Sequence, residues 1–430
     1  MEIGLMVIIA LFVIGYGAIS GRLDRTVITG PMIFVAFGYL LSEKGFGLIE
    51  ADIEHEFINL IAELTLIIVL FSDATRINLK LLRKEHDLPI RLLAIGLPLT
   101  ILAGILFATM IFTEFGFWEA AVLATILAPT DAALAQVVLS GNKVPARIRQ
   151  ALNVESGLND GMALPILLLF ISLVENAGQT ESIDYWLGFG GQQLILAPII
   201  GIMVGYLGGQ IIQLTTRNGW MSDSFQRLSA LGIALLAYAL AEYVGGNGFV
   251  SAFVAGLTLG NTARAVCNCI YEFAEAEGQF LILITFMIFG AVMLPPEIEH
   301  FTGSIILYCV LSLTIIRMLP VFISLIGTKV KFSTMLFIGW FGPRGVASIL
   351  YALIIVEAVG IPMQSELVTI TVATVFISVF VHGLSAFPGV NLYINQLVPR
   401  MQDDTHEMMP EEMPVTEMPL RHTIQYPSGD

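Results

Sequence analysis

Residues 117–140 read FWEAAVLATILAPTDAALAQVVLS, an apolar stretch with a proline and an aspartate near its centre. As an α-helix, about 20 apolar residues are long enough to cross a hydrocarbon core of about 30 Å. Backbone groups in lipid must be satisfied within the protein, so a stretch of this kind is helical. Pro129 interrupts the helix because proline removes a backbone hydrogen bond and clashes with the preceding turn. The segment therefore predicts a membrane helix that is broken in its middle.

Apolar stretches of similar length recur along almost the whole chain. Of its 430 residues, 56% are hydrophobic and 13% are charged, and the mean hydropathy is +0.83. Soluble domains carry about 25% charged residues, and the short alternating strands of a membrane β-barrel are not visible. The sequence predicts an all-α polytopic membrane protein with about thirteen spans. The expected spans are roughly 3–20, 27–42, 57–75, 89–111, 117–140, 149–174, 186–213, 228–244, 247–263, 279–295, 302–326, 333–356 and 367–391.

Basic residues between these spans gather on one side of the membrane. Every lysine or arginine between two spans, apart from Lys44, follows an odd-numbered span. Cytoplasmic loops carry an excess of Lys and Arg, so we expect an external N-terminus and a cytoplasmic C-terminus. The expected location is the cell (inner) membrane. The basic residues concerned are Arg22, Arg25, Arg76, Lys80, Arg83, Lys84, Arg91, Lys143, Arg147, Arg149, Arg217, Arg227, Arg264, Lys329 and Lys331.

Four charged residues lie inside predicted spans, near the expected midplane, and their presence there requires an explanation: Asp131, Asp160, Arg317 and Arg344. Counted from the nearest basic loop residues at about 1.5 Å per residue, each lies roughly 17–20 Å deep. A charge at the bilayer centre costs at least about 2.5–3.5 kcal/mol. The four could form buried ion pairs that lock helices together, or the carboxylates could form an ion site. The ion site is favoured for the carboxylates, whereas the arginines, which never deprotonate, fit either role.

A second broken helix is predicted at 333–356, which contains Gly-Pro-Arg-Gly at 342–345. A simple kink is the alternative for Pro129 or Pro343 taken alone. The two broken spans are the fifth and the twelfth, which favours two inverted repeats with crossing breaks. Discontinuous helices at matching positions in two halves are typical of midplane ion sites in transporters.

The span 149–174 places further oxygen atoms beside Asp160. Ser156 lies one helical turn before Asp160, and Glu155 lies one turn before Asn159, so each pair shares a face. Carboxylate, hydroxyl and carbonyl oxygens suit a hard cation. No aromatic lining for an organic substrate is evident, so the pattern favours a monovalent ion.

These motifs resemble the NhaP branch of the monovalent cation:proton antiporters, which are related to the eukaryotic sodium/hydrogen exchangers. The resemblance covers nearly all of residues 1–395 and is most specific across 128–161. The matching motifs are Ala-Pro-Thr-Asp at 128–131, Glu-Ser-Gly-Leu-Asn-Asp-Gly at 155–161, Phe-Ser-Asp at 71–73, Arg317 and Gly-Pro-Arg-Gly at 342–345.

The resemblance implies a homodimer in the lipid membrane, with a transmembrane antiporter domain at 1–395. Spans 4–6 and 11–13 would form a mobile ion-carrying core, and the remaining spans mainly a dimerisation scaffold. The implied activity is exchange of sodium or lithium for protons, electroneutral and one for one, by alternating access of a single carboxylate site. No resident cofactor is implied. Potassium in place of sodium remains an alternative.

The resemblance also implies roles for individual residues. Asp160 would carry the cation and the proton in turn. Asp131, Ser156 and the Thr130 backbone would complete the monovalent cation site. Asn159, where other branches have a second aspartate, would mark electroneutral exchange.

Two further residues of the resemblance fit less directly. Glu155 would pair with Arg317, although Glu155 lies only about 9 Å along the helix from Arg149, which places it shallower than Arg317. Asp73 would line the entrance or reach the ion through water, and an acid at the edge of a loop is the alternative.

Other classes of function have less support. The net charge of −15 argues against binding to nucleic acid. The chain contains no Gly-x-x-x-x-Gly-Lys motif for a nucleotide. An intramembrane aspartyl protease could use Asp131 and Asp160 as a dyad, but the Gly-x-Gly-Asp context of such proteases is missing around Asp160.

Two remaining features lie near the C-terminus. His382 is the one histidine inside a predicted span, and a packed, hydrogen-bonded ring is favoured over a metal ligand. Residues 396–430 are expected to form a disordered cytoplasmic tail because they are acidic and contain several prolines.

Overall fold

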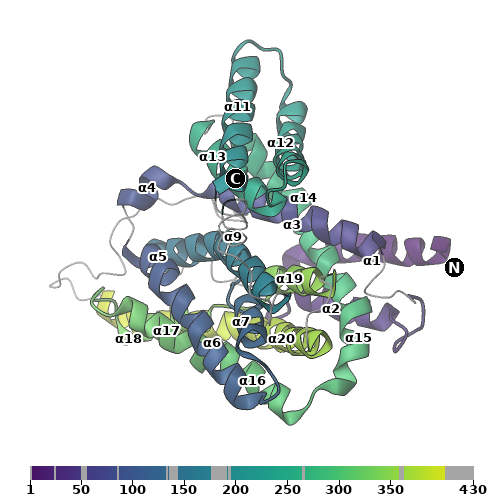
Figure 1. Ribbon diagram of the computed structural model, residues 1–430, viewed down its shortest axis with the longest axis vertical. Coiled ribbons are helices and arrows are strands. Elements are labelled where there is room, and N and C mark those ends of the chain that lie inside the picture. The colour runs from purple at the N-terminus through teal and green to yellow at the C-terminus, as the bar shows by residue number, and fades with distance from the viewer. Residues whose placement is uncertain are drawn as a thin grey trace.

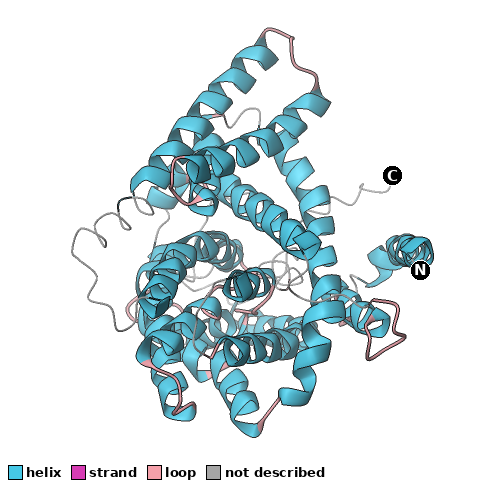
Figure 2. Ribbon diagram, turned by 45° about the vertical axis from the view of Figure 1, so that its right-hand side comes forward, coloured by secondary structure: helices cyan, strands magenta, loops and turns pink. Residues whose placement is uncertain are grey.

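The described part of the chain is almost entirely helical. The computed structural model describes residues 2–23, 26–49, 56–84, 87–131, 134, 144–175, 191, 195–263, 267–357 and 363–401. Within these ranges no strand is present, and a single isolated bridge joins Ser42 to Ile49. The predicted all-α fold is confirmed (Figure 2).

The helices follow one another in the following order. The first half of the chain contains α1 (Glu2–Leu23), α2 (Gly30–Leu41), α3 (Glu56–Arg76), α4 (Leu79–Lys84), α5 (Asp87–Arg91), α6 (Leu97–Ile111), α7 (Phe117–Ile126), α9 (Ala146–Glu175) and α11 (Ala197–Arg217). The second half contains α12 (Asp223–Tyr243), α13 (Gly248–Thr262), α14 (Cys267–Ile288), α15 (Leu294–Glu297), α16 (Gly303–Leu313), α17 (Ile315–Leu325), α18 (Phe332–Trp340), α19 (Val346–Glu357) and α20 (Gln364–Met401).

Several of these helices are long and apolar enough to cross a membrane. Among the described residues, 8 helical segments meet that standard, and α2, α7, α13 and most of α19 are shorter apolar helices. A π-helical turn at Leu92–Gly96 joins α5 to α6 into one span, and another at Phe289–Met293 joins α14 to α15. The membrane fold is thus confirmed, and the number of about thirteen spans stays a prediction.

Non-helical segments are present at both predicted break positions. Helix α7 ends at Ile126, and 127–131 is not helical; apart from residue 134, the rest of the predicted span 117–140 lies outside the described residues. Helix α18 ends at Trp340, and 341–345 is not helical before α19 begins. Each proline lies within its non-helical segment, as expected for a residue that cannot donate a backbone hydrogen bond.

A third interruption was not predicted. The expected span 302–326 is divided into α16 and α17 at Thr314, whose φ and ψ are −117° and −93°. The Thr314 hydroxyl donates to the carbonyl oxygen of Val310, four residues earlier, at 2.5 Å. Hydrogen bonds of this kind compete with the helical pattern and often bend helices.

Helix α20 is longer than the predicted last span. It continues to Met401, past residue 395, where the resemblance ends the membrane domain. No glycine or proline lies at 390–398, so nothing in that stretch stops the helix. The rest of the expected tail, 402–430, lies outside the described residues.

Small residues bring α13 close to α11 and α3. A Cβ atom on Gly205 of α11 would lie 2.4 Å from the carbonyl oxygen of Ala255, and one on Gly260 would lie 2.0 Å from that of Thr75 in α3. Side chains larger than hydrogen therefore cannot be accommodated at these contacts without displacing the backbone. Close backbone approach through small residues is how membrane helices pack without a hydrophobic driving force.

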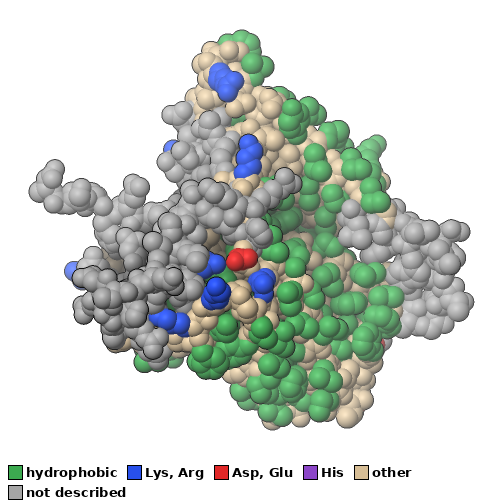
Figure 3. Space-filling model, turned by 90° about the vertical axis from the view of Figure 1, so that its left-hand side faces the viewer, with side chains coloured by type: hydrophobic (Ala, Val, Ile, Leu, Met, Phe, Trp, Pro, Cys, Tyr) green, Lys and Arg blue, Asp and Glu red, His purple; other side chains and the backbone are tan. Residues whose placement is uncertain are grey.

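Helix α9 lies in the middle of the molecule. Figure 1 shows it between α11–α13 on one side and α6, α7, α16 and α20 on the other, with α1 extending away from the body. Lys and Arg side chains gather on the side where α4 and α5 lie, beside a wide apolar surface (Figure 3). The middle of α9 is therefore surrounded by other helices, and this is where the candidate site lies.

Candidate cation site at two crossed helix breaks

The two non-helical segments cross each other and are joined by a backbone hydrogen bond. The N–H of Asp131 donates to the carbonyl oxygen of Pro343 at 2.8 Å. Asp131 is 6% exposed and Thr130 is 4% exposed. Buried backbone groups need partners, and here each break supplies a partner to the other.

The carboxylate of Asp131 lies at the beginning of α19. Its Oδ2 atom accepts a hydrogen bond from the N–H of Val346, the first residue of that helix, at 2.8 Å. Unpaired N–H groups and the helix dipole make a helix N-terminus favourable for a negative charge. A Cβ on Gly345 would lie 2.0 Å from the same oxygen atom, so this close approach requires glycine.

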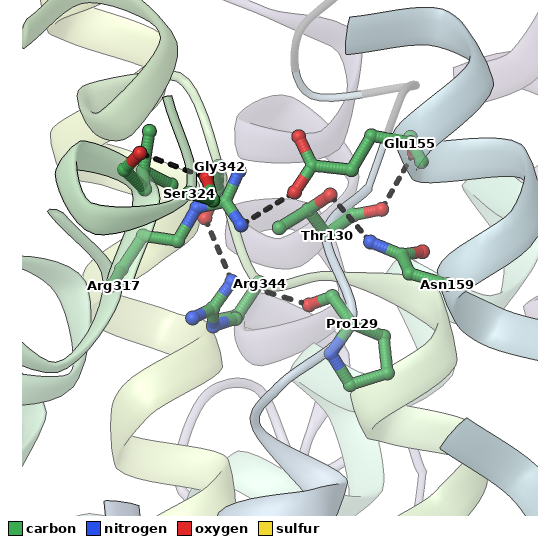
Figure 4. A network of polar contacts seen from close by, with 10 residues as sticks. Pro129, Thr130, Glu155, Asn159, Arg317, Ser324, Gly342 and Arg344 are labelled. Carbon is green, nitrogen blue, oxygen red and sulfur yellow. Dashed lines mark hydrogen bonds and ion pairs between the residues drawn. The ribbon is translucent and has the colours of Figure 1, made fainter. Parts of the chain in front are cut away.

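Helix α9 meets the first break through two side chains. The Ser156 hydroxyl donates to the carbonyl oxygen of Thr130 at 2.6 Å, and the Asn159 amide donates to the Thr130 hydroxyl at 2.8 Å. Asp160 is the next residue after Asn159, lies at the middle of the 30-residue helix and is 6% exposed. Figure 4 shows Thr130 directed at Asn159. Helix α9 is thus bound to the first break at Thr130, with the buried Asp160 as the next residue along the helix.

Glu155 and Arg317 form a buried ion pair at the edge of this group. The Arg317 guanidinium donates to Glu155 Oε1 at 2.5 Å, and each side chain is 3% exposed (Figure 4). The helical count from Arg149 placed Glu155 shallower than Arg317, yet their side chains are in direct contact. The long arginine side chain also passes Gly342, where a Cβ would lie 2.5 Å from its Nε atom.

Arg344 has a different environment. Its Nη1 group donates to the carbonyl oxygens of Gly342 at 3.0 Å and Pro129 at 3.3 Å, and its side chain is fully buried. Both acceptors lie in the non-helical segments, where backbone carbonyls lack helical partners. Arg344 therefore links the two breaks by binding their carbonyl oxygens, in contrast to the carboxylate partner of Arg317.

Asp73 lies against α9 near the other site residues. It is 7% exposed, and its Cβ would be 3.9 Å from a Cβ on Gly157. Gly157 is the residue after Ser156, so Asp73 lies next to the site residues on α9. Asp73 lies three residues before the end of α3, and its side chain is buried.

Two residues on α19 also contact the site and were not identified from the sequence. The Tyr351 hydroxyl donates to the backbone oxygen of Asp160 at 2.6 Å, and the Ser348 hydroxyl donates to the backbone oxygen of Ile126 at 2.8 Å. Their spacing of three residues puts them on one face of the helix. That spacing is the only sequence signal, and many apolar helices contain it by chance.

The residues around the first break and the middle of α9 carry many buried oxygen atoms. Asp131 and Asp160 supply carboxylates, and Thr130, Ser156 and Asn159 supply neutral oxygens. Oxygen ligands of this kind suit hard cations. The positive charges of Arg317 and Arg344 are directed to Glu155 and to backbone carbonyls respectively.

Comparison with known proteins gives three kinds of likeness. A family model described as "Sodium/hydrogen exchanger, transmembrane" matches residues 7–392. The chain is 27% identical over 389 residues to the K(+)/H(+) antiporter NhaP of Alkalimonas amylolytica, covering 89% of this chain and 66% of that protein. It is 25% identical over 384 residues to the K(+)/H(+) antiporter NhaP2 of Shewanella sp. (strain ANA-3), covering 89% of this chain and 65% of that protein. The chain spans about two thirds of the length of these curated relatives.

The fold is also found in a solved structure. The sodium proton antiporter MjNhaP1 from Methanocaldococcus jannaschii at pH 8 matches with a TM-score of 0.74 and 20% sequence identity, covering 92% of this chain and 100% of that chain. At this identity the likeness concerns the fold. The resemblance inferred from the motifs at 128–161 and 342–345 is confirmed by the family match over nearly the whole chain. The chain belongs to the sodium/hydrogen exchanger family.

Proposed function

We propose that this protein is a secondary antiporter that exchanges a monovalent cation for a proton across the membrane. The observation that carries the proposal is the position of Asp160: a buried carboxylate at the middle of a central helix, beside two crossed helix breaks. An ionisable residue at membrane depth is costly and is by default a functional residue. Broken helices with freed backbone groups build the ion sites of transporters.

In this proposal Asp160 binds either the cation or the proton, and only the neutralised site crosses the membrane. A charged, empty carboxylate is too costly to move through the low-dielectric barrier. Competition between two ligands for one carboxylate therefore suffices for obligatory exchange. Asp131, Ser156 and Thr130 complete the cation site. Asp73, next to Gly157, lines the entrance from the cytoplasm.

The same geometry supports a stoichiometry of one cation for one proton. Asp131 accepts a hydrogen bond at the N-terminus of α19, and Glu155 pairs with Arg317, so the scheme assigns both a fixed charge. Asn159 carries no titratable group. Asp160 is then the one group whose protonation changes during the cycle, and exchange is electroneutral.

Sodium, or lithium, is our first candidate for the cation. Potassium is the second candidate because the curated relatives at 27% and 25% identity are named K(+)/H(+) antiporters. Selectivity among monovalent cations depends on cavity size and on the number and field strength of the ligands. A sequence motif does not fix these quantities, so transport measurements must decide between the two ions.

Further parts of the proposal concern assembly and orientation. Spans 4–6 and 11–13 move as the ion-carrying core against a dimerisation scaffold. The N-terminus is outside and the C-terminus is cytoplasmic in the cell membrane, because Lys and Arg side chains gather on the side of α4 and α5 (Figure 3). The proposal also includes a homodimer, as the resemblance to the family implies.

The test is exchange in proteoliposomes with sodium, lithium and potassium supplied separately. An outward proton gradient is imposed, and internal pH is followed with a trapped dye after each cation is added. Cation-dependent proton movement that is absent from protein-free vesicles supports the proposal. Proton movement unaffected by all three cations contradicts it.

A further inference from the structure

The non-helical segment 341–345 is held at both ends by one face of α20. The Ser378 hydroxyl oxygen accepts a hydrogen bond from the N–H of Arg344 at 2.7 Å. His382 Nε2 lies 3.0 Å from the carbonyl oxygen of Trp340, the last residue of α18. Ser378 and His382 are one helical turn apart and are fully or almost fully buried. Two neighbouring side chains therefore bind the last residue before the break and the fourth residue within it.

The contact with Trp340 determines that Nε2 of His382 carries a proton. The Trp340 carbonyl is only an acceptor, so Nε2 must donate to it. Nδ1 lies 3.1 Å from both the hydroxyl oxygen and the backbone carbonyl oxygen of Ser378. The ring is therefore bound through both of its nitrogens. A second proton would add a positive charge to a region that already holds the buried guanidinium of Arg344.

The 341–345 segment, which Ser378 and His382 bind, also contacts Asp131. Pro343, next to Arg344, accepts the backbone N–H of Asp131, and Val346 donates to its carboxylate, both at 2.8 Å. A shift of the segment would therefore move the backbone and the carboxylate of Asp131 together. His382 and Ser378 bind the 341–345 segment, and backbone groups of that segment and of Val346 bind Asp131. Apart from these two side chains of α20, no flexible side chain lies between His382 and Asp131.

We propose that His382, together with Ser378, is a positioning residue for the cation site: it fixes the 341–345 segment and through it Asp131. The inference rests on the proposed function, because it assigns a role toward a cation that Asp131 helps to bind. His382 is not itself a cation ligand in this proposal, because its ring nitrogens contact Trp340 of α18 and Ser378 of α20. The expected consequence of losing it is a weaker cation site within a protein that still folds.

Three variants test this inference. His382→Leu removes both hydrogen bonds, whereas His382→Gln keeps a side-chain N–H that reaches the Trp340 carbonyl. The matched control is Ser385→Ala, also on α20. It removes the hydrogen bond from the Trp340 indole N–H to the Ser385 hydroxyl, 3.0 Å long, and leaves the Trp340 backbone contact in place.

The measurement is the apparent KM and the maximal rate of cation/proton exchange in proteoliposomes, together with the rise in melting temperature on adding sodium or potassium chloride. For His382→Leu we expect an apparent KM raised about tenfold or more, because misplacing a site group by about 1 Å can cost as much as 100-fold. The cation-induced rise in melting temperature should shrink in parallel. His382→Gln should restore a KM close to that of the wild type, and Ser385→Ala should leave it unchanged.

The possible outcomes distinguish failure of this inference from failure of the proposed function. Wild-type exchange with an unchanged KM in His382→Leu would overturn the positioning role alone. A lowered yield and melting temperature with a wild-type KM would also contradict the positioning role, because they would show that His382 contributes only to packing. Absence of any cation-dependent proton movement in the wild type would overturn the proposed function and this inference with it. Should His382→Leu fail to fold, Ser378→Ala removes one oxygen atom only and carries the same expectation for KM.

Discussion

The carboxylate of Asp131 accepts a hydrogen bond from the backbone N–H of Val346, although the two residues are 215 positions apart in the chain. The bond places the acid of one broken helix on the N-terminus of the other. A carboxylate that accepts backbone N–H groups at a helix N-terminus is stabilised in its ionised form. In the proposed mechanism, Asp131 therefore contributes a constant negative charge, and Asp160 contributes the variable one.

The role of Asp160 is tested by replacing it with asparagine. Asp160→Asn keeps the shape of the side chain and removes its ability to bind a proton or to balance a cation. We expect exchange to be abolished while the protein remains folded, as measured by proton movement in proteoliposomes and by size-exclusion chromatography in detergent. The control is Glu299→Gln, an exposed acid that pairs with Lys44 far from the site. A folded Asp160→Asn protein that still couples sodium to protons would show that another group is the carrier.

Arg317→Ala is expected to lower stability more than it changes ion preference. Removing one partner of a buried ion pair leaves the other charge uncompensated, which costs about 3–5 kcal/mol. The melting temperature in detergent measures this loss. The double variant Glu155→Gln with Arg317→Ala removes the stranded charge and should recover part of the melting temperature. A single variant with normal melting temperature but altered cation preference would instead assign Arg317 to selectivity.

Gly345→Ala tests the close approach at Asp131. A Cβ at this position would lie 2.0 Å from Asp131 Oδ2 and 2.8 Å from its Cβ, so the contact cannot survive unchanged. We expect exchange to be lost or its KM to rise, with destabilisation of about 1–3 kcal/mol as for other overpacked sites. The matched control is Gly232→Ala on α12, where nothing lies within 4 Å of the new Cβ. Equal behaviour of the two variants would mean that the Asp131 contact is not required.

The predicted stoichiometry is tested with a membrane potential. With one titrating carboxylate, a bound sodium ion replaces one proton and no net charge crosses. The potential, worth about 2.3 kcal/mol per charge per 100 mV, should then not drive transport. Proteoliposomes with a potassium/valinomycin potential and no sodium or pH gradient should show no sodium flux. A flux that follows the potential would identify Asp131 as a second proton carrier, and if potassium is itself transported, the potential must be set by another ion.

Features that depend on local chemistry could be predicted from the sequence. Runs of apolar residues predict membrane helices because lipid forbids unpaired backbone groups. Pro129 and Pro343 predict the two breaks because proline cannot complete a helical hydrogen bond wherever it occurs in a span. Asp131 and Asp160 were identifiable because charges inside apolar runs are costly.

Which of these groups meet depends on tertiary packing. The helical count placed Glu155 shallower than Arg317, yet the two form an ion pair, because a count along one helix contains no information about its neighbours. The contacts of Tyr351 and His382 join segments that are 191 and 42 residues apart, and neither residue type marks a site by itself. Hydrophobic pattern and helix breaking are properties of a few consecutive residues, whereas the choice of hydrogen-bond partner depends on how whole helices pack.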